Sequence, residues 1–150
     1  MKVLDTREYV SVLKALAEEG KAVSMTVAGN SMNPFLVHGR DAVCFEKRNR
    51  ELHVGDVVFY QRKNGQYIMH RICKTKPEGF YLVGDAQTEI EGPIEEAQIF
   101  AIVTKVRRNG ICMGPGDFWW EFFEHIWIRM LPIRPAVRAI YNICYRIRRA

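Results

Sequence analysis

Ser31, His70 and several acidic residues near position 90 have the side chains needed for acyl-transfer chemistry. A serine hydroxyl is a weak nucleophile at neutral pH and needs a nearby base to take its proton. Histidine, with an ordinary pKa of about 6.5, is mostly neutral at pH 7 and can accept that proton. A carboxylate on the far ring nitrogen would fix the tautomer of this base, and Asp85, Glu89 and Glu91 are available for that role.

These residues lie in three segments, whose order in the chain is more informative than any single residue. The segments are residues 29–36 (Gly29-Asn30-Ser31-Met32-Asn33-Pro34-Phe35-Leu36), 67–72 and 81–86. Alone, Ser31 is typical of a turn cap, His70 of a core histidine and Asp85 of a turn residue. In a catalytic site, Gly29 would let the backbone approach a substrate carbonyl, and the N–H of Ser31 could join an oxyanion hole.

The element expected before the first segment is an amphipathic helix at residues 5–19. Asp5 and Glu8 have the spacing of a capping box, and Gly20 follows as a C-terminal cap. The apolar stripe that gives the helical period is Tyr9, Val12, Leu13 and Leu16.

Short apolar runs then predict a series of strands, at residues 23–27, 42–45, 56–61, 67–73, 80–83 and 99–106. Asn64-Gly65 separates two of these runs and Asn109-Gly110 follows the last one. Asn-Gly supplies the positive φ angles of tight hairpin turns. The middle of the chain is therefore expected to be mainly antiparallel β, with His70 on the return strand of a hairpin.

The end of the chain, residues 117–150, is expected to be a helical tail separate from a domain at residues 1–116. Its aromatic stripe is Phe118, Trp119, Phe122, Phe123, Ile126, Trp127, Met130 and Leu131. Pro132 and Pro135 are expected to break this helix before a second, basic one. The tail could pack on the β core or lie in the headgroup plane of a membrane, and the tryptophans with the basic end favour the membrane.

Composition limits the other classes of function. The chain has 150 residues, 48% of them apolar, and a net charge of +5, which suits one soluble domain. The four cysteines lack metal-ligand spacing, and no nucleic-acid-binding motif is present. We expect no metal, no cofactor and no nucleic-acid partner. The N-terminus does not have the pattern of a secretory signal peptide, and no stretch is long and apolar enough for a spanning helix.

The three segments and one further motif together resemble a known family. In order, the chain holds Ser31-Met32-Asn33-Pro34-Phe35-Leu36, Gly55-Asp56-Val57-Val58, His70-Arg71 and Gly84-Asp85. This set is similar to the signal peptidase I family, in the endoplasmic-reticulum-like branch that uses histidine instead of lysine as base. The resemblance covers about residues 20 to 106. The chain departs from the family in having Ala86-Gln87 after the last motif and no N-terminal membrane anchor.

The resemblance implies a signal-peptidase-like antiparallel β core and a role for each matching residue. Ser31 would be the nucleophile, His70 the base, and Arg71 would pair with Asp85 as a structural ion pair. The orienting acid would be Glu91, or less well Glu89, so that Asp85 and Glu91 compete as the third member. Residues of the oxyanion and substrate-binding region would be Gly29, Asn30, Met32 and Pro34.

The resulting hypothesis is a serine endopeptidase that removes a signal-like or leader-like segment after small residues. Its partner would be a peptide or preprotein, and it would be peripheral or monotopic at a membrane. A cytoplasmic leader peptidase for a ribosomally made peptide is an alternative, as is a non-catalytic, membrane-bound domain that binds peptides. A third alternative is a self-cleaving regulator, although the related self-cleaving repressors use a lysine base and carry a DNA-binding module.

Overall fold

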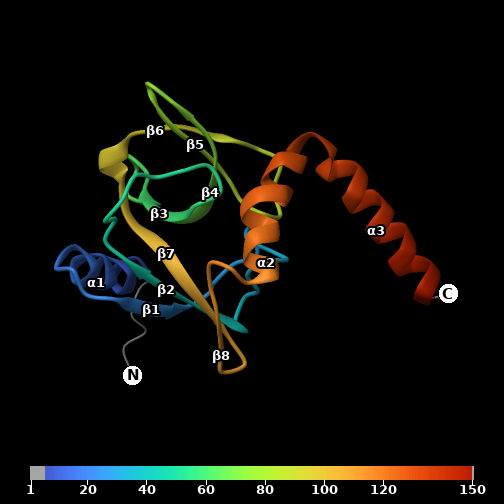
Figure 1. Ribbon diagram of the computed structural model, residues 1–150, viewed down its shortest axis with the longest axis horizontal. Coiled ribbons are helices and arrows are strands. Elements are labelled where there is room, and N and C mark those ends of the chain that lie inside the picture. The colour runs from blue at the N-terminus through green and yellow to red at the C-terminus, as the bar shows by residue number, and fades with distance from the viewer. Residues whose placement is uncertain (1–5, 150) are drawn as a thin grey trace.

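A single antiparallel sheet forms the body of the protein, with helices against it (Figure 1). The structure, a computed structural model, describes residues 6–149. Within that range eight strands follow the spatial order β1-β2-β7-β3-β4-β5-β6, with β8 paired to β7. The strands are β1 (Val23–Thr26), β2 (Asp41–Glu46), β3 (Val57–Gln61), β4 (Tyr67–Lys76), β5 (Gly79–Val83), β6 (Glu91–Ile94), β7 (Ile99–Arg108) and β8 (Ile111–Met113). The helices are α1 (Thr6–Glu18), η1 (Glu96–Gln98), α2 (Phe118–Glu121), η2 (Phe122–Ile126), η3 (Trp127–Ile133) and α3 (Arg134–Arg149).

The expected N-terminal helix is present as α1, and its C-terminal cap is confirmed. Gly20 has a φ of +85°, and its N–H donates to the carbonyl of Ala17 while the N–H of Lys21 donates to that of Leu16. This pair of bonds is the Schellman arrangement that ends many helices. The buried face differs from the expected stripe, because Val10, Leu13 and Ala17 are buried whereas Tyr9 and Val12 are exposed. Asp5, the first member of the expected capping box, lies outside the described residues.

The mainly antiparallel β fold is confirmed, and two strands were missed. β6 contains Gly92 and Pro93, which disfavour strands, but it lies at the edge of the sheet where proline is tolerated. β8 is only three residues long and follows Asn109 and Gly110, whose φ angles of 52° and 79° form the expected tight turn. At the other hairpin only Gly65 has positive φ, so the turn there is of a different type.

Side chains of successive residues in β3 enter two separate cores, one on each face of the sheet. Val57 and Phe59 belong to the core that also contains α1 residues, whereas Val58 and Tyr60 belong to the second. This is the alternation expected of a strand with both faces covered. In the register between β3 and β4, Val58 lies opposite His70 and Val57 opposite Arg71.

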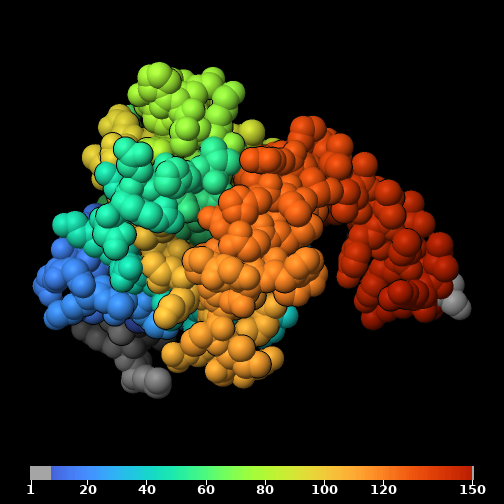
Figure 2. All heavy atoms as spheres, in the orientation of Figure 1, coloured from blue at the N-terminus to red at the C-terminus, as the bar shows by residue number. Residues whose placement is uncertain are grey.

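The tail packs on the body through α2 and η2 and then leaves it. Trp120 and Phe123 join the first core, with ring centroids 5.8 Å and 5.1 Å from that of Phe35. The 3-10 helix η3, which contains Pro132, ends at Ile133, and α3 begins at Arg134 and runs in a different direction (Figure 1), so the expected break lies at the prolines although no coil residue separates the two helices. Pro135 lies in the first turn of α3, where helices tolerate a missing N–H. α3 then projects from the body, and a gap separates its far end from the orange tail helices (Figure 2).

Two of the tryptophans that favoured membrane binding are engaged with the protein. Trp120 is buried, and the indole N–H of Trp127 donates to the carbonyl of Asp85 at 2.9 Å. Phe118 and Trp119 remain exposed. Among residues 6–149, no helix combines the length and the apolar character needed to cross a bilayer.

Candidate active site

Ser31 lies in a turn that follows β1 and is anchored by its neighbours. Met32, Phe35 and Leu36 are buried in the first core, and the N–H of Leu36 donates to the carbonyl of Met32 at 2.8 Å. Ser31 itself is half-buried. The Ser-Met-x-Pro-x-Leu motif is therefore a set of apolar anchors that hold the serine at the surface of the core.

The loop at residues 84–87 packs against the backbone of Ser31. The N–H of Ala86 donates to the carbonyl of Ser31 at 2.9 Å. A Cβ added at Gly84 would lie 2.4 Å from that same carbonyl oxygen, a distance that real side chains do not adopt. The glycine of the Gly84-Asp85 motif is thus required for close approach to the serine turn.

The same loop is held on its other side by the tail. Arg134 is 3% exposed, and its Nη1 donates to the carbonyls of Gly84 and Gln87 at 3.1 Å and 2.9 Å. Its guanidinium also lies over the ring of Trp127, 4.9 Å from the centroid. The first residue of α3 therefore takes part in shaping the loop beneath Ser31.

His70 and Ser31 line the same two pockets. One pocket has a volume of about 260 Å³ and includes residues of the first strand region, such as Val27 and Ala28; the other has about 700 Å³. His70 lies on β4 and is 6% exposed. Its hydrogen bond in the described chain goes to Tyr60, so the imidazole and the serine hydroxyl share the pockets without being bonded to each other. Such contacts are often long in unliganded enzymes and tighten with substrate.

Tyr60 is the residue of this site that sequence reasoning missed. Its hydroxyl is 3.4 Å from Nδ1 of His70 and donates to Oε2 of Glu91. Nε of Arg62 donates to the other oxygen of Glu91 at 2.6 Å. Finding Tyr60 requires the register of β3 against β4, because it is two residues beyond Val58, the partner of His70, and so shares a face with it.

The surroundings of His70 keep its imidazole neutral. Burial lowers its pKa to about 4; the negative charge of Glu91 raises it in part and the positive charge of Arg62 lowers it. Burial and the hydrogen bond to Glu91 raise the pKa of Tyr60 well above its ordinary value. At pH 7 His70 is therefore an unprotonated base and Tyr60 keeps its proton.

Arg71 and Asp85 form a buried ion pair on the opposite face of β4. Nε and Nη2 of Arg71 each donate to a different oxygen of Asp85, both at 2.9 Å, and Nη1 donates to the carbonyl of Gly55 at 2.7 Å. Both carboxylate oxygens of Asp85 are occupied in this way. Of the two competing acids, the structure connects Glu91 to His70 through Tyr60, while Asp85 faces Arg71. Glu89 is exposed at the rim of the larger pocket.

The expected oxyanion and substrate residues are only partly brought together. The N–H of Gly29 is already bonded to Nδ1 of His38 at 2.9 Å, so it is not available to a substrate oxygen. Pro34 is exposed and lines neither pocket, whereas Asn30 lines the larger one and Met32 the smaller one. Within residues 6–149, the N–H of Ser31 has no acceptor and can serve as an oxyanion donor.

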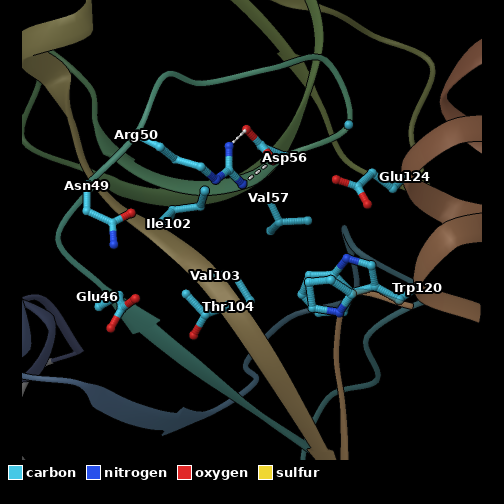
Figure 3. A pocket seen from close by; sticks show the side chains of 12 residues that line it. Glu46, Asn49, Arg50, Asp56, Val57, Ile102, Val103, Thr104, Trp120 and Glu124 are labelled. Atoms are coloured by element: carbon cyan, nitrogen blue, oxygen red, sulfur yellow. Dashed lines mark hydrogen bonds and ion pairs between the residues drawn. The ribbon is translucent and has the colours of Figure 1, made fainter. Parts of the chain in front are cut away.

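The Gly55-Asp56 motif lies elsewhere, at a pocket of about 200 Å³ beside the tail (Figure 3). Asp56 accepts two hydrogen bonds from Arg50, both at 2.9 Å. A Cβ on Gly55 would lie 2.4 Å from the carbonyl oxygen of Glu124, so this glycine allows the tail to approach. The motif therefore has a structural role in the described chain.

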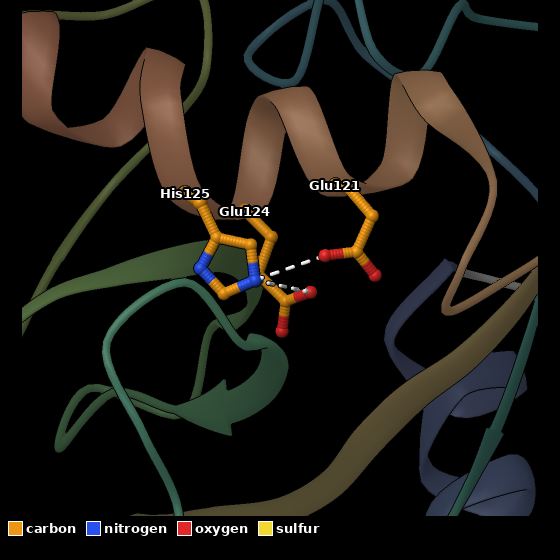
Figure 4. Close-up of side chains that lie close together, drawn as sticks. All are labelled: Glu121, Glu124 and His125. Carbon is orange, nitrogen blue, oxygen red and sulfur yellow. Dashed lines mark ion pairs between the residues drawn. The ribbon is translucent and has the colours of Figure 1, made fainter.

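One group of side chains in the described chain has metal-ligating chemistry, namely Glu121, Glu124 and His125 (Figure 4). Nε2 of His125 is 3.0 Å from a carboxylate oxygen of Glu121 and 3.6 Å from one of Glu124. Burial raises the pKa of Glu124. These residues line neither of the pockets that Ser31 and His70 share, and the contacts of His125 with the two carboxylates account for their arrangement.

Comparison with known proteins assigns a family to most of the chain. No curated protein and no solved structure matches the chain. The family model described as Peptidase S24-like matches residues 2–106, a segment that contains Ser31, His70 and Asp85. This is a family of serine-peptidase type, a broader assignment than signal peptidase I. The chain belongs to the Peptidase S24-like family.

Proposed function

We propose that this protein is a serine endopeptidase of the signal peptidase I type, in which Ser31 is the nucleophile and His70 the general base. The observation that supports this most directly is that Ser31 and a neutral, buried His70 line the same two pockets. A neutral imidazole beside a serine hydroxyl is the arrangement needed to activate it. Histidine, rather than lysine, in this position favours the histidine-base branch.

The reaction follows from these two residues and one backbone group. Oγ of Ser31 attacks the scissile carbonyl carbon while His70 takes the hydroxyl proton, and the N–H of Ser31 stabilises the oxyanion. The amide C–N bond then breaks, and His70 gives its proton to the leaving amine. Water hydrolyses the resulting acyl-enzyme with His70 again as base, which regenerates the serine hydroxyl.

The pockets support an extended peptide as substrate. The smaller pocket, of about 260 Å³, is lined by Val27, Ala28 and Met69 together with polar residues such as Arg62 and Gln87, and has room for the chain on one side of the cut. The larger pocket is polar, with Asn30, Gln87 and Thr88 in its lining, and suits the chain on the other side. Cleavage after small residues is the preference that the resemblance to signal peptidase I implies.

The test uses a mixed library of extended peptides and detects the cut bonds by mass spectrometry. We expect cleavage after small residues by the purified chain, and none by Ser31→Ala or His70→Ala variants that keep the circular dichroism and melting temperature of the parent. The absence of cleavage, together with no acylation of Ser31 by a biotinylated β-lactone, would contradict the proposal. Cleavage of the chain itself at a rate independent of its concentration would instead favour a self-cleaving regulator.

We also propose that α3 binds an anionic membrane surface. No acidic residue follows Glu124, while the arginines after it, apart from the buried Arg134, are Arg129, Arg138, Arg146, Arg148 and Arg149. On α3 the apolar positions recur with helical period at Val137, Ile140, Cys144 and Ile147, opposite Arg138 and Arg149. The isoleucines of this face are more than half exposed. An exposed apolar face with arginines opposite it is typical of a helix that lies in the headgroup plane.

Flotation of the full chain with vesicles tests the membrane proposal without removing tail residues that belong to the core. We expect recovery with phosphatidylcholine vesicles that contain phosphatidylserine, and much less with pure phosphatidylcholine. Ile140→Glu with Ile147→Glu should abolish flotation, whereas Ile111→Glu, at an exposed position of β8, should not. Equal recovery of all proteins in the soluble fraction would contradict the proposal. Protease accessibility in intact cells would then distinguish the two sides of the membrane, and with them a leader peptidase from a signal peptidase.

A further inference from the structure

The hydroxyl of Tyr60 lies between the base and an acid that do not contact each other. Tyr60 is fully buried on β3, the neighbour of the β4 strand that carries His70. Glu91 is the first residue of the edge strand β6. In the sheet order β3-β4-β5-β6, β6 lies two strands from β4, on the side away from β3. The curvature of the sheet brings all three together, and the hydroxyl contacts both partners.

We propose that Tyr60 is a positioning residue that connects Glu91 to His70 and fixes the tautomer of the base. This inference rests on the proposed function in taking His70 as the base. The contacts of Tyr60 with His70 and Glu91 do not depend on that function. It makes the acid–base connection of this site a three-residue chain, His70–Tyr60–Glu91, instead of a direct carboxylate–imidazole contact.

The direction of the two hydrogen bonds follows from the protons available. A tyrosine hydroxyl has one proton to donate, and an ionised carboxylate can only accept. The proton of Tyr60 therefore goes to Glu91, and its oxygen can only accept at His70. Nδ1 of His70 must then carry the proton, which leaves Nε2 with its lone pair free for the serine hydroxyl.

Arg62 fixes the acid at the outer end of this chain. Its Nε donates to Oε1 of Glu91 at 2.6 Å, so that Oε2 is left for the hydroxyl of Tyr60. Arg62 also lines both pockets that Ser31 and His70 share. The pair of Arg62 and Glu91 thus holds one carboxylate oxygen at the place where the tyrosine needs an acceptor.

The chain of bonds acts when His70 becomes charged. After His70 takes the serine proton, the imidazolium still donates from Nδ1 to the oxygen of Tyr60, and Glu91 polarises that oxygen through its own bond. The proton stays on His70 throughout, because Tyr60 retains its own proton. Tyr60 therefore orients the base and passes on the stabilisation by Glu91 without itself being ionised.

The first test reads the tautomer directly, by nitrogen-15 spectra of protein labelled at its histidines, with His70→Gln to assign the signal. We expect His70 of the parent protein to be protonated at Nδ1. Tyr60→Phe keeps the ring but removes the hydroxyl, and we expect His70 to shift towards protonation at Nε2. Tyr81→Phe is the matched control, because Tyr81 also donates to a glutamate, Glu78 at 2.9 Å, but at the surface.

The second test measures the rate at which a biotinylated β-lactone acylates Ser31 between pH 3 and pH 9. We expect Tyr60→Phe to lower the rate about ten- to a hundredfold, because a base without its orienting partner is misplaced for proton transfer. Glu91→Gln should also lower the rate and move the acid limb of the profile to lower pH, because the charge that raises the pKa of His70 is lost. Tyr81→Phe should match the parent.

The two tests separate failure of this inference from failure of the proposed function. A parent protein protonated at Nε2, or a Tyr60→Phe variant with the parent tautomer and rate, would overturn the role of Tyr60. If His70 is protonated at Nδ1 and loses this in Tyr60→Phe, the role of Tyr60 is supported even where Ser31 is not acylated. Absence of acylation would then contradict only the proposed peptidase function.

Discussion

Replacing Asp85 by asparagine separates the structural role of this residue from a catalytic one. Arg71 and Asp85 are 2% and 0% exposed, so the substitution leaves a buried guanidinium without its counter-charge. Removing one partner of a buried pair costs about 3–5 kcal/mol of unfolding free energy. The total free energy of unfolding of a protein is about 5–15 kcal/mol, so the variant should still fold but be much less stable. With a urea slope of about 2 kcal/mol per M, the unfolding midpoint should fall by about 2 M.

A double variant, Arg71→Met with Asp85→Leu, provides the decisive comparison. It removes both charges, and the main remaining loss is the donor to the Gly55 carbonyl, which costs about 1–3 kcal/mol. We therefore expect the double variant to unfold at a higher urea concentration than Asp85→Asn and to keep acylation of Ser31. Glu19→Gln, which breaks an exposed pair with Lys21, should cost less than about 1 kcal/mol. A folded double variant without acylation would refute the reasoning and make Asp85 a catalytic acid.

Four further predictions concern the base, the serine turn and the tail. Since burial lowers the pKa of His70 to about 4, activity should persist below pH 6 with its acid limb near pH 4, which a pH–rate profile measures. Between pH 6.5 and about 4 the unfolded chain binds a proton at His70 that the folded chain does not bind, so the free energy of unfolding is higher above this range. It should fall by about 3 kcal/mol as the pH is lowered through the range, which urea unfolding at several pH values measures. Gly84→Ala should displace Ser31 and lower its acylation at least tenfold, whereas Gly114→Ala, with 3.6 Å to its nearest neighbour, should not. Trp120→Ala should lower the free energy of unfolding by about 3–5 kcal/mol in urea titrations, because the ring is buried in the first core.

The parts of the fold that could be predicted are those whose pattern is local. Alternating apolar residues and the Asn109-Gly110 turn identify strands and a hairpin without knowledge of their neighbours. β6 could not be predicted, because Gly92 and Pro93 lower its strand propensity and only its edge position makes it a strand. In the tail, the stripe indicated a helix but could not show what covers it. In the structure, the helix face that carries Trp120 and Phe123 packs on the first core.

The candidate site divides in the same way. Ser31 and His70 could be selected because motifs around them have a fixed order along the chain. Tyr60 could not, since its role depends on the register of β3 against β4 and on the return of Glu91 from an edge strand. Gly29 was expected in the oxyanion and substrate-binding region, but the fold places His38 at its N–H. Such contacts depend on tertiary structure that no local pattern records.

The position of Arg134 bears on how small an active version of this protein can be. This residue lies beyond the segment matched by the family, yet its guanidinium holds the carbonyls of Gly84 and Gln87 beneath the serine turn. A fragment that ended with the matched segment would lose the bonds from Arg134 to both carbonyls, although Gly84 would still accept from the N–H of Gln87, and it would uncover Phe35. A fragment that keeps the contacts of Arg134 with this loop therefore extends at least to the first turn of α3. Any fusion or truncation intended to preserve the site should keep the chain intact to that point.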